Sequence, residues 1–142
     1  MLKIVSKKLN IISKDEGSIL PIIKSSSEFF SGFGEVYIST IEPNVVRAWK
    51  KHQNICQYFV VPQGRVKFVF LVGQNNNKNI FKEIIIGEQN YSFIKVPKNV
   101  WYGFANISDS ISMIVNVINL PHAEAISEFK DYIDNPILDY SW

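Results

Sequence analysis

Cysteine, net charge and long apolar runs are all scarce in this sequence of 142 residues. The one cysteine, Cys56, excludes an internal disulfide framework. Its place in the apolar run 55–61 predicts a small core residue rather than a nucleophile. The formal net charge of +2 is too small to favour nucleic acid as a partner. No apolar stretch approaches the ~20 residues of a membrane-spanning helix, so no membrane partner is expected.

The rest of the composition is that of a folded chain. Hydrophobic residues make up 46% of the sequence and aromatic residues 13%, which argues against disorder. By its length, the chain is expected to form a single domain over residues 1–142. The first residues lack an apolar segment followed by a small-residue cleavage site, so a cytoplasmic location is expected.

Short apolar runs separated by turn signals dominate the chain. Residues 33–40 alternate apolar and polar side chains, which predicts a half-buried strand. An opening pair of strands is expected at 2–5 and 9–12, followed by a turn at 14–17. Further strands are expected at 45–49, 55–61, 66–72, 80–86, 92–96 and 111–118. Evenly spaced short strands are typical of an all-β barrel or sandwich and not of βαβ units.

Only the C-terminal part has a helical pattern. Residues 123–133 place four side chains on one stripe, Ile126, Phe129, Tyr132 and Ile133, with acidic residues elsewhere, and Pro136 follows as a stop signal. This predicts one short C-terminal helix.

Two stretches, 44–64 and 87–106, keep the residue spacing of the two cupin motifs. The positions are occupied by Asn44, Lys50, His52, Gln57 and Gly64 in the first motif, and by Pro97, Asn99, Tyr102 and Asn106 in the second. Of the four positions that hold metal ligands in cupins, only the one at His52 keeps a ligand. Lysine has no free lone pair at neutral pH, and Gln and Tyr are poor ligands for divalent transition metals. The spacing therefore predicts a cupin jelly-roll barrel without a metal or other cofactor.

The polar residues of these motifs are candidates for a binding site. Alternate residues of a strand share a face, so Lys50 and His52 are expected to point together into the barrel mouth. Gln57 and Tyr102 are expected to face them, and the apolar walls are expected to come from Phe68, Phe70, Phe93 and Phe104. A few polar groups within apolar walls are typical of a small-molecule site.

Each candidate also has a structural interpretation. Lys50 could be a surface lysine and His52 a hydrogen-bonded structural histidine, while Gln57 and Tyr102 could simply bond each other. Trp101 beside the mouth is either packing or a platform for a base or sugar. His122 is expected to be structural.

Several ordered stretches resemble the dTDP-4-dehydrorhamnose 3,5-epimerase family, especially its shorter bacterial members. They are residues 33–37, 45–49, 64–66, 94–104 and 120–122, and the terminal Asn135-Pro136 with Trp142. The resemblance runs from about Asp15 to the end. It implies a metal-free cupin that binds a dTDP-4-keto-6-deoxysugar between the subunits of a homodimer.

The resemblance also implies roles for individual residues. The family's catalytic histidine falls on Lys50, and the aspartate that orients it falls on Asn135, with Asp134 one residue earlier. The family's tyrosine falls near Val115 or Asn116, and a further pocket histidine falls on Tyr102. Arg47 is kept, which implies contact with the diphosphate or the sugar.

Two functions remain open at this point. The first is a nucleotide-sugar epimerase or isomerase with replaced residues, in which Lys50 or His52 removes a proton next to a ketone and Tyr102 assists. A 3,4-type ketoisomerase that uses His52 is a variant of this function. The second is a non-catalytic module that binds a nucleotide sugar or another carbohydrate. On either hypothesis the substrate-binding residues are expected to be Arg47, Gln57, Trp101, Asn116 and Asn135.

Overall fold

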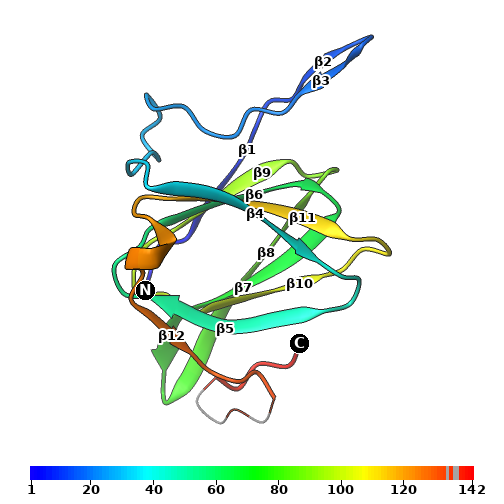
Figure 1. The fold of residues 1–142 in the computed structure, drawn as a ribbon. Coiled ribbons are helices and arrows are strands. Elements are labelled where there is room, and N and C mark those ends of the chain that lie inside the picture. The colour runs from blue at the N-terminus through cyan, green and yellow to red at the C-terminus, as the bar shows by residue number, and fades with distance from the viewer. Residues whose placement is uncertain (134, 136–137) are drawn as a thin grey trace.

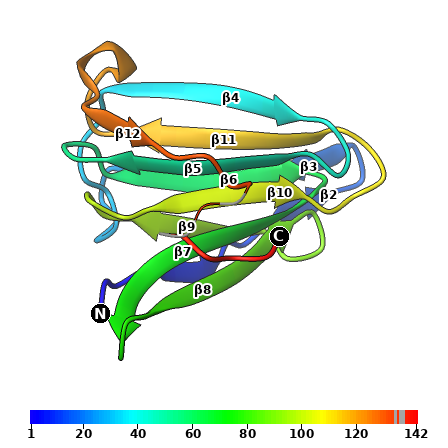
Figure 2. The ribbon, with the colours of Figure 1, turned by 90° about the horizontal axis from the view of Figure 1, so that it is seen from below.

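The computed structural model describes residues 1–133, 135 and 138–142. Two five-stranded antiparallel sheets face each other, and a two-stranded hairpin projects from one end (Figures 1 and 2). The first sheet has the order β1 (Val5–Lys8), β9 (Ser92–Val96), β6 (Gln57–Gln63), β11 (Ser112–Ile118), β4 (Glu35–Ile41). The second has the order β12 (Ser127–Phe129), β5 (Val46–His52), β10 (Tyr102–Asn106), β7 (Arg65–Asn75), β8 (Lys78–Gly87). The all-β jelly-roll prediction is therefore confirmed.

The opening pair of strands was predicted wrongly. β1 pairs with β9, and the hairpin is formed instead by β2 (Ile12–Lys14) and β3 (Gly17–Ile19). The predicted turn at 14–17 is the turn of this hairpin. β10 was also missed as a strand, because its five residues carry little alternation and include Gly103.

The predicted C-terminal helix is wrong as well. Among the described residues of 123–133, the helical part is the end of the single-turn 3-10 helix η1 (His122–Glu124), and β12 follows it. β12 pairs with the edge strand β5, which satisfies the backbone groups of both strands. Three residues of the stripe that suggested a helix, Ile126, Phe129 and Ile133, are 55%, 69% and 62% exposed, while Tyr132 packs on an apolar cluster. No helix among the described residues is long and apolar enough to cross a membrane.

Apolar side chains pack in three layers. The interior cluster lies between the two sheets and includes Phe59, Phe68, Phe70 and Tyr102. A second cluster covers the outer face of the first sheet, where N-terminal residues pack on Tyr58, Val60 and Phe93. A third cluster covers the outer face of the second sheet, where the C-terminal segment crosses the strands (Figure 2) and brings Leu138, Tyr140 and Trp142 onto Trp49. Both sheets thus carry apolar packing on two faces, although the outer side chains of β4 stay exposed.

A β-bulge interrupts the pairing of β5 with β10 in the second sheet. Lys50 pairs with Tyr102 and Arg47 pairs with Phe104, so three steps along β5 match two steps along β10. The extra residue places Ala48 and Trp49 together in the outer cluster. Arg47 and Lys50 consequently face the same interior cavity, although a regular strand would place them on opposite faces.

Gly103 lies opposite this bulge and is the basis of a stability prediction. A Cβ atom there would lie 2.4 Å from Ala48 Cβ and 2.7 Å from Trp142 Cζ2. We expect Gly103→Ala to lower the free energy of unfolding by about 1–3 kcal/mol through overpacking, as measured by urea denaturation. Gly73→Ala is the matched control, because its Cβ would meet only Met1 Cγ at 3.1 Å, the far end of a flexible side chain. Equal stability of the two variants would contradict the packing argument.

Candidate functional site

A cavity of about 430 Å³ opens between the two sheets. Its walls come from both sheets and from the segment that follows β11. The lining residues are Tyr37, Ser39, Arg47, Ala48, Trp49, Lys50, Phe59, Tyr102, Phe104, Ile114, Asn116, His122 and Phe129. Aromatic and aliphatic walls with a few polar groups are typical of a small-molecule site.

The cavity holds two cations that no described carboxylate neutralises. The guanidinium of Arg47 lies 5.5 Å from the ring centre of Phe104, and the ammonium of Lys50 lies 5.3 Å from that of Phe129. By contrast, the neighbouring Lys51 forms an ion pair with Glu128 at 2.9 Å. Uncompensated positive charge in a cleft favours an anionic ligand.

The cavity changes the pKa of Lys50 in the direction that suits a proton acceptor. Burial lowers the pKa of its ammonium, and repulsion from Arg47 lowers it further. A larger fraction of Lys50 is therefore a neutral amine, the form that can accept a proton.

A network of tyrosines and amides beside these cations connects the two sheets. The Asn116 amide donates to the Tyr37 hydroxyl at 2.8 Å and to Gln57 Oε1 at 3.0 Å. The Tyr102 hydroxyl donates to the same Gln57 oxygen at 3.0 Å. Gln57 is buried behind Asn116 and Tyr102 and supports them without lining the cavity. The mutual bond that the sequence suggested for Gln57 and Tyr102 is thus present.

His52 lies next to the cavity but not in its lining. Its side chain is buried, and its Nδ1 lies 2.8 Å from the Ser127 hydroxyl. Burial, together with the charges of Lys50 and His122, lowers the pKa of its imidazole to about 4. His52 is therefore neutral at physiological pH, and its catalytic role stays a prediction.

Sequence reasoning missed three polar residues of the cavity lining, Tyr37, Ser39 and His122. Tyr37 and Ser39 occupy the inward positions of the alternating strand β4, and that alternation was the available signal. His122 was expected to be structural, yet it lines the cavity with its ring centre 5.8 Å from that of Tyr37. Its place in the Leu120-Pro121-His122 stretch was the only hint.

Other expected site residues lie elsewhere. Phe93 belongs to the outer cluster of the first sheet, on the opposite face of β9 from the interior. Trp101 belongs to the outer cluster of the second sheet, where the ammonium groups of Lys51 and Lys130 lie 5.0 and 5.1 Å from its ring centre. Phe93 was misplaced because one residue of register reverses the face of a strand residue.

The C-terminal candidates are not part of the cavity lining either. The Asn135 side chain donates to the Asp131 carbonyl at 2.8 Å and accepts from the Leu138 amide at 3.2 Å. Asp134 and Pro136 lie outside the described residues. Within the described ranges, no three His, Cys, Asp or Glu side chains come together as metal ligands.

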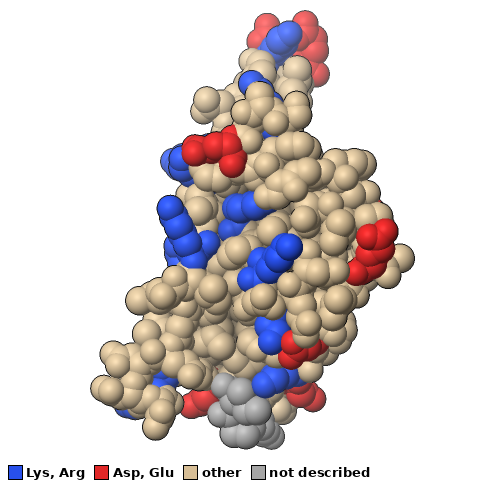
Figure 3. Space-filling model, turned by 90° about the vertical axis from the view of Figure 1, so that its left-hand side faces the viewer, with Lys and Arg blue, Asp and Glu red and all other residues tan. Residues whose placement is uncertain are grey.

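The surface charge agrees with a cationic site. Figure 3 shows the side of the molecule on which η1 lies in Figure 1, and there Lys and Arg side chains gather over the middle while Asp and Glu lie mainly toward the edges. This distribution favours the approach of an anion from that side.

These features define a jelly-roll protein with a cationic small-molecule cavity, and comparisons with known proteins give its family. A dTDP sugar isomerase from Desulfovibrio desulfuricans G20 is 32% identical and superposes with a TM-score of 0.89, over 98% of this chain and 90% of that one. A probable low-salt glycan biosynthesis epimerase of Haloferax volcanii, Agl13, is 27% identical over 114 residues, which are 78% of this chain and 73% of that protein. No family model matches the sequence.

A more distant structure supports the fold alone. It is a dTDP-6-deoxy-D-glucose-3,5-epimerase from Legionella pneumophila in complex with dTDP-4-keto-L-rhamnose, 16% identical with a TM-score of 0.79, over 98% of this chain and 78% of that one. The chain belongs to the family of dTDP-sugar isomerases and dTDP-4-dehydrorhamnose 3,5-epimerases.

The lowered pKa of His52 predicts how stability depends on pH. Between the ordinary value of 6.5 and the folded value of about 4, the unfolded chain binds a proton that the folded chain does not. Stability should therefore fall as the pH is lowered through this window. His52→Asn, which keeps a polar group near Ser127, should make the fall less steep, as measured by urea midpoints from about pH 4 to 7. Carboxylates act equally in both proteins, so parallel pH profiles would refute this assignment.

Proposed function

We propose that this protein is an isomerase or epimerase of a dTDP-linked 4-keto-6-deoxysugar and that it acts in glycan biosynthesis. The single observation that carries the proposal is the pair Arg47 and Lys50, which face one cavity without a described carboxylate partner. Family membership supports the nucleotide-sugar class, and the Haloferax relative supports glycan biosynthesis.

The two cations suit different parts of such a substrate. A guanidinium forms bidentate hydrogen bonds with phosphate oxygens, so we assign Arg47 to the diphosphate. Removal of a proton next to a ketone requires a base with a pKa near neutrality. We assign this role to Lys50, because it lines the cavity itself and because burial and Arg47 lower its pKa toward this range, whereas His52 is not part of the lining.

Substitution of the two cations should have separable effects. Arg47→Ala should weaken dTDP binding by about 1.5–3 kcal/mol through loss of a charge-assisted hydrogen bond, as measured by calorimetry. Lys50→Met keeps the aliphatic stem and removes the amine. It should abolish exchange of solvent deuterium into dTDP-4-keto-6-deoxyglucose, followed by proton NMR, with a smaller loss of affinity.

Lys51→Met is the matched control for this experiment. Lys51 is the next residue of β5, but its ammonium pairs with Glu128 and lies over Trp101 rather than in the cavity. Normal exchange by Lys50→Met would show that another group is the base. A wild-type protein that binds the nucleotide sugar without any exchange would instead be a non-catalytic binding module.

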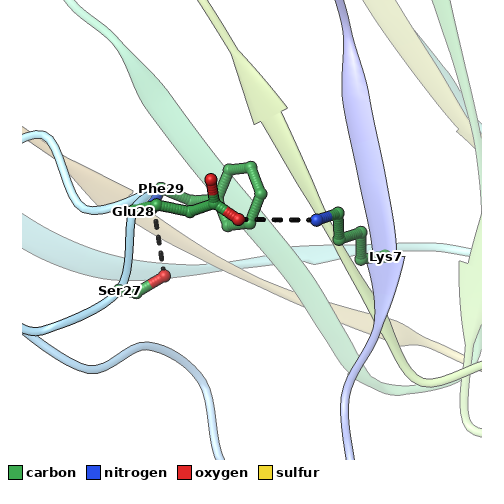
Figure 4. Close-up of polar contacts among 4 residues, drawn as sticks. All are labelled: Lys7, Ser27, Glu28 and Phe29. Carbon is green, nitrogen blue, oxygen red and sulfur yellow. Dashed lines mark hydrogen bonds and ion pairs between the residues drawn. The ribbon is translucent and has the colours of Figure 1, made fainter.

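We also propose that the protein acts as a homodimer. The β2–β3 hairpin projects from the barrel (Figure 1), and its Ile12 and Ile19 are 49% and 56% exposed. The chain that follows is held on its own barrel, where Lys7 pairs with Glu28 at 3.5 Å and lies 4.5 Å from the ring centre of Phe29 (Figure 4). The hairpin tip therefore lacks an apolar partner on its own barrel among the described residues.

Sedimentation velocity at micromolar concentration tests the dimer. The wild-type protein should sediment as a dimer. Ile19→Glu should shift it toward monomer, because Ile19 in the projecting hairpin is 56% exposed on one chain and a charge buried against a second chain is costly. A strictly monomeric wild-type protein would rule the dimer out.

A further inference from the structure

The C-terminal segment, residues 138–142, lies outside the barrel yet contacts the part of the second sheet that carries the two cations. It crosses the outer face of this sheet (Figure 2). The ring centre of Trp142 lies 5.2 Å from that of Trp49. The edge of the same ring covers Gly103, where an added Cβ would lie 2.7 Å from Cζ2 and 3.0 Å from Cη2 of Trp142. Since Gly103 lies in β10 opposite the bulge, Trp142 contacts both strands at that point.

Contacts with other strands hold this segment in place. Leu138 is only 1% exposed. The Tyr140 hydroxyl donates to a carboxylate oxygen of Glu83 on β8 at 2.6 Å, and the ammonium of Lys67 on β7 donates to the same hydroxyl at 3.2 Å. Trp142 is therefore held against the bulge by contacts that its neighbours make on two further strands.

The bulge is what allows the two cations to share a cavity. In a regular strand, residues three apart lie on opposite faces, so Arg47 and Lys50 could not both face inward. The bulge turns Ala48 and Trp49 outward together. The ring of Trp49 is nevertheless only 1% exposed, because aromatic rings that include that of Trp142 pack on it. Burial of this ring stabilises the bulged form of β5 over a regular one.

We propose that Trp142 is a positioning residue, which packs on the bulge from outside the sheet and so keeps Arg47 and Lys50 turned into one cavity. Trp142 is not part of the cavity lining, so its effect passes through the sheet. Its effect on catalysis rests on the proposed function. Its effect on the position of the two cations does not, and can be measured separately.

The titration of Lys50 reports whether the bulged form is kept. Burial lowers the pKa of the Lys50 ammonium, and the charge of Arg47 lowers it further. The other titratable groups around Lys50 come from four elements: His52 on β5, Tyr102 on β10, Tyr37 on β4 and His122 in η1. Regular pairing of β5 would turn one of the two cations out of the cavity. Either change should raise the pKa of Lys50 toward its ordinary value.

The first test follows this titration by NMR in the full-length protein with lysine labelled with carbon-13 at Cε. The Lys50 resonance is the one that Lys50→Met lacks. Trp142→Ala should move its titration midpoint to higher pH. Trp142→Phe should move it less, because a ring remains on the bulge. This variant also loses no hydrogen bond, since Trp142 Nε1 has no partner among the described residues.

Leu71→Ala is the matched control. Leu71 packs in the same outer cluster, but it lies on β7, which β10 separates from β5. Both alanine variants remove apolar packing and should lower the urea midpoint. Only Trp142→Ala should move the midpoint of Lys50, and an unchanged midpoint, or an equal shift in Leu71→Ala, would overturn the proposal. If Trp142→Ala does not fold, Trp142→Phe should still exceed Leu71→Ala in this shift, and equal shifts would overturn the proposal.

A second measurement connects the position of the cations with catalysis. Trp142→Ala should slow exchange of solvent deuterium into dTDP-4-keto-6-deoxyglucose by about 10- to 100-fold at saturating substrate, because a small misplacement of a reacting group is costly. Leu71→Ala should exchange at the wild-type rate. A wild-type rate in Trp142→Ala would overturn the positioning role in catalysis. If the wild-type protein exchanges no sugar nucleotide, the proposed function fails, while the titration of Lys50 still decides whether Trp142 positions the two cations.

Discussion

The β-bulge in β5 is the constraint on which the site depends. It shifts the register between β5 and β10 so that Arg47 and Lys50 face one cavity while Ala48 and Trp49 face outward. The bulge fits only because Gly103 opposite it has no side chain and Trp142 closes over that space. Packing of the C-terminal segment on the outside of the sheet is thus linked to the position of the two cations inside it.

The cavity holds two ionisable side chains, Lys50 and Tyr37, that are partly removed from water. Lys50 lacks a described carboxylate partner, and its reduced solvation favours the neutral amine. Tyr37 on the facing wall is pushed toward its neutral form by the same desolvation. The same loss of solvation therefore favours the uncharged form of both side chains within one cavity.

The four positions that hold metal ligands in cupins have other contacts in this protein. At the ligand positions, Gln57 and Tyr102 bond each other, and His52 bonds the Ser127 hydroxyl. Lys50 at the remaining position contributes charge to the cavity instead. The side chains at these four positions thus form hydrogen bonds beside the cavity and supply one of its two positive charges.

Much of the fold could be predicted from local pattern. Alternation along residues 33–40 and the short apolar runs located most strands, because a strand's side-chain period is a local property. The C-terminal helix was predicted wrongly for a non-local reason. The stripe of Ile126 and Phe129 fits a helical period, but this segment pairs with β5 and forms the strand β12 instead.

The sequence by itself determined the jelly-roll strands, the loss of metal ligands, and Arg47, Lys50 and Asn116 as polar candidates. Only the tertiary structure decided which face each candidate occupies. It moved Trp101 to the outer cluster and brought Tyr37 and His122 to the cavity. The physical reason is that a single bulge, or one residue of register, turns a strand side chain from one face to the other, and register is fixed by the neighbouring strands and their packing.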